Sequence, residues 1–379
     1  MKRTILSLVV FVFCIHTVIA AEAPPISISK NNTIALSLSP IGGADGPAIT
    51  KTLNADLAAS GYFSSSSAAG ASFIVSGASS GDSLQGKVVD HEGKTVIMNT
   101  YTGSPVARAH AFADDIIKTI TGNAGFASGK IAFVATKTGH KEIYIADWNG
   151  TNVQRLTNDN SIDVHPSLSP DGRRLAYTGY ASGYADIYEI DLASGARNRI
   201  AKYPGTNSGA AYAPDSRRIA CTLSKDGNPE LYVLSGGAHR LTHTPGVESS
   251  PTWSPDGNEI IYSYDEHGGP QLYRISANGG SGQLIQTGHG YCTEPNWSPD
   301  GAKVAFNIRE GGAFEVAVLD LQGGGVKVVG TGENPAWGPD SRHLIYTEDG
   351  ALILLDTQTG KKTKVVDGLG KITEPSWSR

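Results

Sequence analysis

The chain has 379 residues, which is enough for two or three folding units, and its apolar content of 39% is ordinary for a globular protein. Its net charge of −5 shows no basic excess, which argues against nucleic acid or an anionic membrane surface as a partner. The 46 glycines indicate many tight turns.

Residues 1–20 are typical of a secretory signal peptide. Lys2 and Arg3 precede an apolar run, and Val18 and Ala20 place small residues at the cleavage positions. A membrane anchor is the alternative, but the run is short for a bilayer span and no later segment is apolar enough. We therefore expect an exported chain that starts at Ala21 and has no membrane span.

After removal of that segment the chain holds two cysteines, Cys221 and Cys292. They occupy similar strand-like places in different repeats, so we expect two separate buried thiols rather than a disulfide. Without a disulfide framework, the fold needs a large hydrophobic core.

A short phrase recurs six times. The copies are HPSLSPDG (165–172), GAAYAPDS (209–216), SPTWSPDG (250–257), EPNWSPDG (294–301), NPAWGPDS (334–341) and EPSWSR (374–379). Each copy reads as the end of a strand with an aromatic or apolar pivot residue, followed by a turn set up by proline, aspartate and glycine. Ser216 and Ser341 replace that glycine, so we expect these two turns to be altered or strained.

Three strand-like runs follow each phrase. The clearest set begins with EIIYSY at Glu259, continues with QLYRI at Gln271 and ends with GQLIQ. Short alternating runs between Gly, Asp and Asn turns are successive β-hairpins. One four-stranded sheet in every forty-odd residues is the period of a β-propeller blade.

The chain stops just as it begins another copy of its repeat. A body of three runs at 130–157 has no phrase before it, and the last phrase has no body after it. The unpaired phrase and the unpaired set of three runs make one complete repeat if the strand around Glu374 to Ser378 pairs beside the Lys130–Ala135 strand. An open solenoid is the alternative, but it would leave two exposed strand edges. We therefore predict a closed six-bladed β-propeller over 127–379, with the pivots wedged between neighbouring sheets.

The preceding segment, 21–126, has a different pattern. Apolar residues at helical spacing predict one helix in the stretch 47–63, stopped by Gly61, and a second helix at 105–120. A strand-like run starts at Thr33, and two or three more follow the first helix, the last two joined by the turn DHEGK. These elements predict an α/β domain in which two helices cover a small mixed sheet.

The sequence contains only incomplete matches to catalytic and metal-binding motifs. A Gly-x-Ser-x-Gly match at 77–81 lies in a Gly/Ser-rich hairpin instead of a strand-to-helix turn. His239 and His243 lack a third metal ligand, and the DWNGTN stretch (147–152) is half of a calcium loop and reads as a turn. We therefore predict no catalytic residue, no metal site and no cofactor.

Four stretches taken together resemble the TolB family, the periplasmic component of the Tol–Pal system of Gram-negative bacteria. They are DLAASGYF (56–63), RAHAFADDIIKTITGNAGF (108–126), KIAFVA (130–135) and the WSPDG series. The resemblance implies a monomeric periplasmic scaffold without enzymatic activity. It also implies that the propeller binds the lipoprotein Pal and that the N-terminal segment engages TolA, in outer-membrane integrity and cell division. Other outer-membrane or peptidoglycan-associated proteins are further candidate partners.

The resemblance places TolA binding on Ala21, Glu22, Ala23, Pro24, Pro25, Ile26, Ser27 and Ile28. For Pal, propeller geometry brings the loops between successive blades to one mouth of the ring. These loops carry Asp163, His165, Thr206, Asn207, Glu248, Ser249, Tyr291, Thr293, Glu294, Glu333, Asn334, Thr373 and Glu374. This acidic and polar set, with one aromatic residue, is suited to recognising a polar protein surface.

Two other functional classes stay open at this point. WSPDG phrases also occur in the propellers of oligopeptidases and in sugar- or quinone-related propellers. One alternative is therefore a propeller enzyme that uses the central channel on peptides or sugars, and another is a ligand-binding propeller unrelated to the Tol system.

Overall fold

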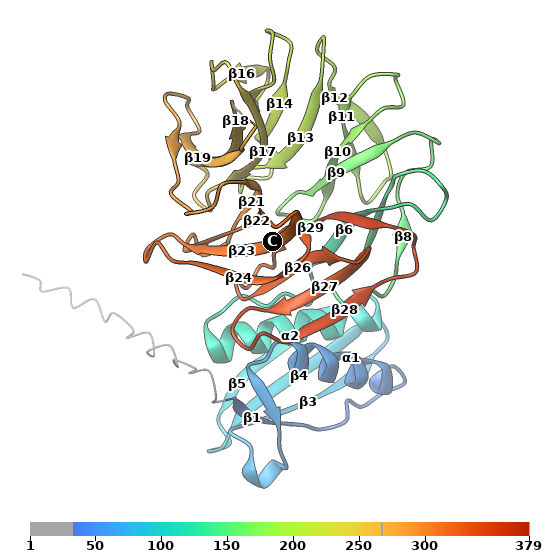
Figure 1. Cartoon of the computed structure of the whole chain (residues 1–379). Helices are drawn as coiled ribbons and strands as arrows, with labels where there is room; N and C mark the ends of the chain where they lie inside the picture. Colours follow the sequence, from blue (N-terminus) through green and yellow to red (C-terminus); the bar gives the residue numbers. More distant parts are fainter. Residues whose placement is uncertain (1–32, 267, 379) are drawn as a thin grey trace, which may run out of the picture.

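The structure is a computed structural model that describes residues 33–266 and 268–378 (Figure 1). Over these ranges the chain forms a small mixed sheet with two helices and a six-bladed β-propeller, so the predicted fold class is confirmed. The predicted signal peptide and the predicted TolA-binding segment lie outside the described residues. In the described part, none of the helices combines the length and apolarity needed to cross a bilayer.

The N-terminal sheet has the strand order β2-β1-β3-β4-β5. Its strands are β1 (Ile34–Leu38), β2 (Phe63–Ser65), β3 (Phe73–Ser80), β4 (Ser83–Asp90) and β5 (Thr95–Thr102), with a 3₁₀ turn at Ala68–Gly70. β1 runs parallel to β2 and β3, and the other pairs are antiparallel. Helices α1 (Gly46–Ala59) and α2 (Pro105–Thr121) lie between this sheet and the propeller (Figure 1).

The boundaries of α2 follow from its sequence. The Ser104 hydroxyl accepts a hydrogen bond from the Ala107 N–H at 3.2 Å, and Pro105 occupies the first helical position. The helix ends at Gly122, whose φ of 77° is left-handed. Phe112 and Ile116 are fully buried on the apolar face that the sequence predicts.

Each propeller blade is a four-stranded antiparallel sheet. The closing blade combines β29 (Ile372–Trp377) with β6 (Lys130–Ala135), β7 (Glu142–Asp147) and β8 (Gln154–Arg155). The next two contain β9 (Asp163–Leu168), β10 (Arg174–Gly179), β11 (Asp186–Asp191) and β12 (Arg197–Ala201), then β13 (Asn207–Tyr212), β14 (Ile219–Leu223), β15 (Glu230–Leu234) and β16 (Ala238–Arg240). The last three contain β17 (Val247–Trp253), β18 (Glu259–Asp265), β19 (Gln271–Ser276) and β20 (Gln283–Leu284), then β21 (Cys292–Trp297), β22 (Lys303–Glu310), β23 (Ala313–Asp320) and β24 (Val326–Thr331), then β25 (Glu333–Trp337), β26 (His343–Glu348), β27 (Ala351–Asp356) and β28 (Lys362–Val366).

The two ends of the repeat region close the ring as predicted. β29 pairs antiparallel with β6, in a register that places Ile372 opposite Ala135. The Ser378 N–H donates to the Lys130 carbonyl at 3.0 Å, and the Lys130 N–H donates to the Ser378 hydroxyl at 2.8 Å. This pairing removes two free strand edges.

The pivot residues lie between blades, as predicted. Trp253, which is 1% exposed, packs in one cluster with Ala220 and Leu231 of the preceding blade. Hydrogen bonds add to this packing: the Trp297 N–H donates to the Thr252 hydroxyl of the preceding blade at 3.1 Å. Each blade is therefore fixed to its neighbour by apolar and by polar contacts.

The two serines that replace turn glycines are strained and also bonded. Ser216 and Ser341 have φ values of 57° and 55°, in the left-handed region that the turn requires. The Ser216 hydroxyl accepts a hydrogen bond from the Asp171 N–H of the preceding blade at 3.1 Å, and the Ser341 hydroxyl accepts one from the Asp300 N–H at 2.9 Å. A hydrogen bond contributes about 1 kcal/mol, which offsets much of the strain.

Both cysteines are free, as expected. Cys221 in β14 and Cys292 in β21 are fully buried in separate hydrophobic clusters. Burial raises the pKa of both thiols, so they stay protonated and act as small apolar side chains.

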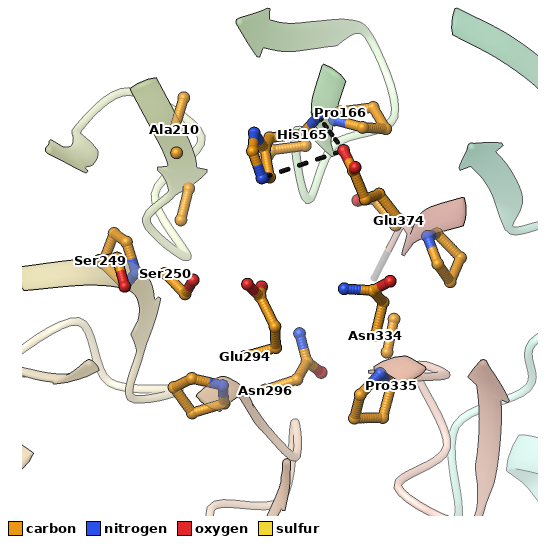
Figure 2. A pocket seen from close by; sticks show the side chains of 18 of the residues that line it. His165, Pro166, Ala210, Ser249, Ser250, Glu294, Asn296, Asn334, Pro335 and Glu374 are labelled. Carbon is orange, nitrogen blue, oxygen red and sulfur yellow. Dashed lines mark hydrogen bonds and ion pairs between the residues drawn. The ribbon is translucent and has the colours of Figure 1, made fainter. Parts of the chain in front are cut away.

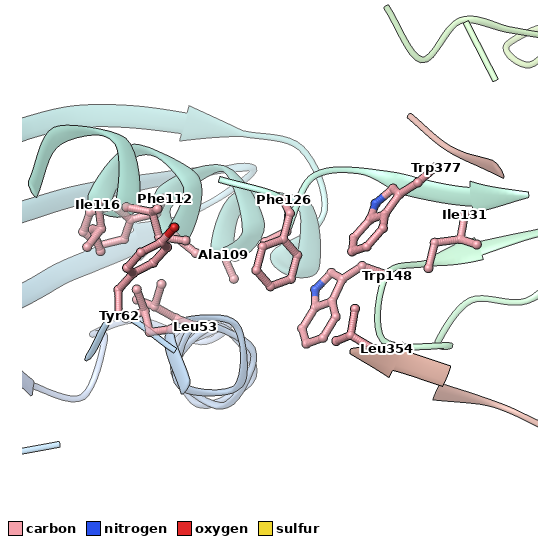
Figure 3. Close-up of a cluster of buried hydrophobic side chains, with 14 of the residues drawn as sticks. Leu53, Tyr62, Ala109, Phe112, Ile116, Phe126, Ile131, Trp148, Leu354 and Trp377 are labelled. Carbon is pink, nitrogen blue, oxygen red and sulfur yellow. The ribbon is translucent and has the colours of Figure 1, made fainter. Parts of the chain in front are cut away.

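The N-terminal domain is joined to the closing blade by a continuous hydrophobic cluster (Figure 3). Phe126, which follows α2, packs edge-on against Trp148 at 5.1 Å and against Trp377 at 5.8 Å between ring centroids. Buried polar contacts surround this cluster. Asp56 of α1 accepts from the Trp148 ring N–H at 3.1 Å and lies 2.7 Å from the His110 Nδ1.

A buried ion pair adds a second contact between the two domains. The Arg342 guanidinium binds Asp356 at 2.6 and 2.9 Å, donates to the Gly61 carbonyl at 3.3 Å and stacks over the Tyr62 ring. Arg342 also holds the pKa of Asp356 down at about 2, against the opposing effect of burial, which is the larger single influence. Because Arg342 and Asp356 belong to the blade of β25–β28, this contact fixes the N-terminal domain to the blade that precedes the closing blade.

Candidate functional site at the channel mouth

Each innermost propeller strand contains a β-bulge near its start. At the bulge one residue has a left-handed backbone, and the next residue is proline, or Ala210 in one blade. The six left-handed residues are His165 (φ 52°), Gly209 (63°), Ser250 (51°), Glu294 (51°), Asn334 (56°) and Glu374 (55°). Since five of them are not glycine, the ring stores about 1–2 kcal/mol of backbone strain at each of those five positions.

These six residues line a cavity of about 200 Å³ in the central channel (Figure 2). The rings of Pro166, Pro251, Pro295, Pro335 and Pro375 form much of its wall. The strained backbone therefore directs polar side chains toward the axis of the ring, while the prolines give the cavity a rigid apolar wall.

The cavity is acidic. Glu374 accepts a hydrogen bond from the His165 N–H at 2.6 Å, and its carboxylate lies 4.0 Å from the His165 imidazole. Burial raises the pKa of Glu294, and the nearby Glu374 and Glu333 carboxylates raise it further, although His165 and a hydrogen bond from Ser250 act in the opposite direction. Among the described residues that line the cavity, His165 is the only basic side chain.

Five residues of the predicted mouth set lie on this cavity: His165, Ser249, Glu294, Asn334 and Glu374. Two others, Glu333 and Thr373, line a neighbouring depression between the last blade and the closing blade. Tyr291 packs against Phe314 at 6.1 Å between ring centroids. Thr206 is exposed in its loop, and Thr293 is paired with Asn307 of the next strand.

Three residues of the predicted set, Asp163, Asn207 and Glu248, are fully buried in the propeller. The Asn207 amide donates to the carbonyls of Ala185 at 3.0 Å and Tyr203 at 2.8 Å, so it holds its own loop together. These three buried residues support the loops of the mouth from the interior of the propeller.

Asp163 and Glu248 are unusual acids. Burial, as the main cause, raises the pKa of each to about 7, and Asp159 beside Asp163 adds to the effect. The Glu248 carboxylate accepts a hydrogen bond from the Thr244 hydroxyl at 2.6 Å. Their protonation therefore changes close to neutral pH.

The sequence analysis missed an exposed apolar patch at the edge of the mouth. It consists of Ile162, Tyr180 and Tyr184, which are 49%, 40% and 75% exposed. The Tyr180 N–H donates to the Ile162 carbonyl at 3.0 Å, which holds the β10–β11 turn beside the loop that leads to His165. The signal was the presence of two tyrosines in a turn, where polar residues are usual.

The weak motifs have structural roles. Ser79 of the Gly-x-Ser-x-Gly match lies in the β3–β4 hairpin, and its hydroxyl accepts a hydrogen bond from Arg108 at 2.9 Å. The DWNGTN stretch forms a turn in which Asp147 accepts hydrogen bonds from Thr151 and Asn152. Within the described ranges, no group of three or more His, Cys, Asp or Glu side chains is placed to hold a metal ion.

The chain is similar to known proteins over much of its length. The model of the TolB β-propeller domain matches residues 117–379. A TolB homologue of Chlorobaculum tepidum is 37% identical over 154 residues, which cover 40% of this chain and 35% of the relative. A Tol–Pal system protein TolB of Desulfosudis oleivorans is 32% identical over 178 residues, which cover 44% of this chain and 40% of the relative.

The chain thus spans about a third of the length of these curated relatives. A solved structure extends the likeness in three dimensions. The crystal structure of TolB from Acinetobacter baumannii is 24% identical, superposes with a TM-score of 0.78, and covers 92% of this chain and 97% of its own. At this level of identity the superposition establishes the shared fold.

Proposed function

This chain belongs to the TolB β-propeller family, and from that premise we propose that it is the periplasmic scaffold of a Tol–Pal system. In this proposal the channel mouth binds the lipoprotein Pal, and Ala21–Ile28 engages TolA. The protein then links the outer membrane to the inner membrane, for outer-membrane integrity and constriction during cell division. Its role is protein binding, without turnover.

The ring of left-handed residues supports the mouth as the binding site. Glycine would adopt this backbone without strain, as Gly209 does, yet His165, Ser250, Glu294 and Asn334 hold it at a cost. Strain of this kind also occurs in structural turns, such as those of Ser216 and Ser341, but strained residues cluster at binding and active sites. Polar side chains aimed at a channel with no described catalytic or metal constellation favour recognition over chemistry.

The patch of Ile162, Tyr180 and Tyr184 supports a protein as the ligand. Interfaces between proteins commonly combine exposed aromatic residues with a polar rim. Here a hydrogen bond ties the turn that carries the two tyrosines to the loop that leads to His165, so the patch and His165 of the acidic cavity belong to the same blade.

The test is charge reversal at the mouth. Glu294→Lys combined with Glu374→Lys should weaken binding of the purified periplasmic domain of Pal at least tenfold in calorimetry, because two acids that face the partner become basic. The matched control is Glu92→Lys with Glu259→Lys, which changes the net charge equally on surfaces outside the cavity. An unchanged affinity in the mouth variant, with the fold intact by circular dichroism, would remove this mouth as the Pal site.

A further inference from the structure

The proposed function leaves open what enters the channel. Resting on that proposed function, we infer that the partner inserts one positively charged side chain, a lysine or an arginine, into the cavity between Glu294 and Glu374.

The charge of the cavity requires a counter-ion. Glu294 and Glu374 contribute two carboxylates, and Glu333 adds a third nearby. The described residues place no lysine or arginine on the cavity wall, and the imidazole of His165 lies toward Glu374. A protein surface that seals this mouth without bringing a cation would bury acidic groups without compensation, which is strongly unfavourable.

The raised pKa of Glu294 is consistent with this deficit. Loss of solvent and the neighbouring carboxylates disfavour its charged form, and Ser250 and His165 compensate only in part. An incoming ammonium or guanidinium group would restore the charged form through a charge-assisted hydrogen bond.

The shape of the cavity is suited to a long basic side chain. Its volume of about 200 Å³ admits a single side chain, and its wall alternates proline rings with polar groups. Lysine and arginine have an aliphatic stem with a charged head, so the stem can pack on the prolines while the head reaches the acids. Figure 2 shows the Glu294 carboxylate directed toward the middle of the cavity, where its oxygens can accept further N–H donors.

The experiment is a double-mutant cycle with the full mature chain and the periplasmic domain of Pal. Each exposed lysine and arginine of Pal is replaced singly by glutamine, and its affinity is measured by calorimetry against the wild-type chain and against Glu294→Gln. We expect one Pal variant that loses at least tenfold affinity for the wild-type chain but less than twofold for Glu294→Gln, because the two groups interact directly. Glu92→Gln, with its carboxylate on the N-terminal domain, is the control that should leave the tenfold loss unchanged.

The possible outcomes distinguish failure of the inference alone from failure of the proposed function. If Pal binds the wild-type chain and none of its basic residues couples to Glu294, the inference is wrong and the proposed function stands. If binding is lost when EDTA is added, a metal ion occupies the channel, and the inference is also wrong. If Pal does not bind at all, the proposed function fails, and the inference fails with it.

Discussion

The closing blade and the channel mouth are built from the same repeat, yet they differ in almost every physical respect. At the closing blade Trp377 is buried, packs against Phe126 and completes an apolar cluster shared with the N-terminal domain. At the mouth, 3 residues earlier in the same strand, Glu374 has a strained backbone and faces an acidic cavity. One strand therefore holds the ring together at one end and presents a charged group to the cavity at the other.

Two glycines of the closing region leave space for the Trp377 side chain. A Cβ atom at Gly338 would lie 2.9 Å from the Trp377 ring, and one at Gly129 would lie 2.7 Å from its ring nitrogen. Other copies of the repeat have serine at the position of Gly338, as at Ser254. At the closing blade, glycines make room for the Trp377 ring. At the mouth, by contrast, left-handed residues with polar or charged side chains occupy positions where glycine would avoid the strain.

The largest effect is expected at the closing blade. Trp377→Ala should destabilise the protein by about 3–5 kcal/mol, because it empties the cluster that joins the two domains at the point where the two ends of the repeat region meet. Denaturant unfolding at constant pH measures the change. Trp253→Ala, between two ordinary blades, is the matched comparison and should cost less. A midpoint equal to the wild type for Trp377→Ala would contradict the role of closure.

An intermediate effect is expected beneath the mouth and depends on pH. The pKa of Asp163 is about 7 in the fold and about 3.9 in the unfolded chain, so the fold favours the protonated form. The stability associated with this proton is complete below about pH 4 and is lost as the pH rises through about 7.

Asp163→Asn should remove this dependence, because the amide keeps a donor toward Asp159 without a charge. We expect the variant to be more stable than the wild type at pH 8 by about 1–3 kcal/mol and to match it at pH 4, measured by chemical denaturation. Glu92→Gln, which alters an exposed acid, should leave the pH profile unchanged. Parallel profiles for Asp163→Asn and the wild type would refute the interpretation.

The smallest effect on stability is expected within the ring of left-handed residues. Glu294→Gly should raise stability by at most about 1 kcal/mol, because relief of strain is offset by the greater freedom of glycine in the unfolded chain. The same variant should bind Pal at least tenfold more weakly, which calorimetry measures.

Gly172→Ala is the reverse control for this strain. It places a Cβ on a left-handed residue with no atom within 4 Å, and should therefore cost about 1 kcal/mol. A clear loss of stability in Glu294→Gly would show that the ring is structural and would weaken the comparison drawn above.

The sequence by itself determined the architecture of this protein. The phrase spacing, the two-residue alternation and the split repeat predicted six blades, and the pairing of β29 with β6 confirms the closure. Helix α2 was predicted within a residue of its ends because its capping signals, Pro105 and Gly122, are local. Local signals of this kind act over a few residues and need no knowledge of the partner strand.

The tertiary structure decided which residues of each loop face the channel. Asp163 and His165 are two positions apart, yet the first is buried and the second is directed toward the cavity. The β-bulge at His165 and Pro166 depends on the register with β10. The raised pKa of Asp163 depends on its burial in the propeller and on the neighbouring Asp159. Such contacts join residues of different strands and blades, so their energies could not be read from the local pattern of the chain.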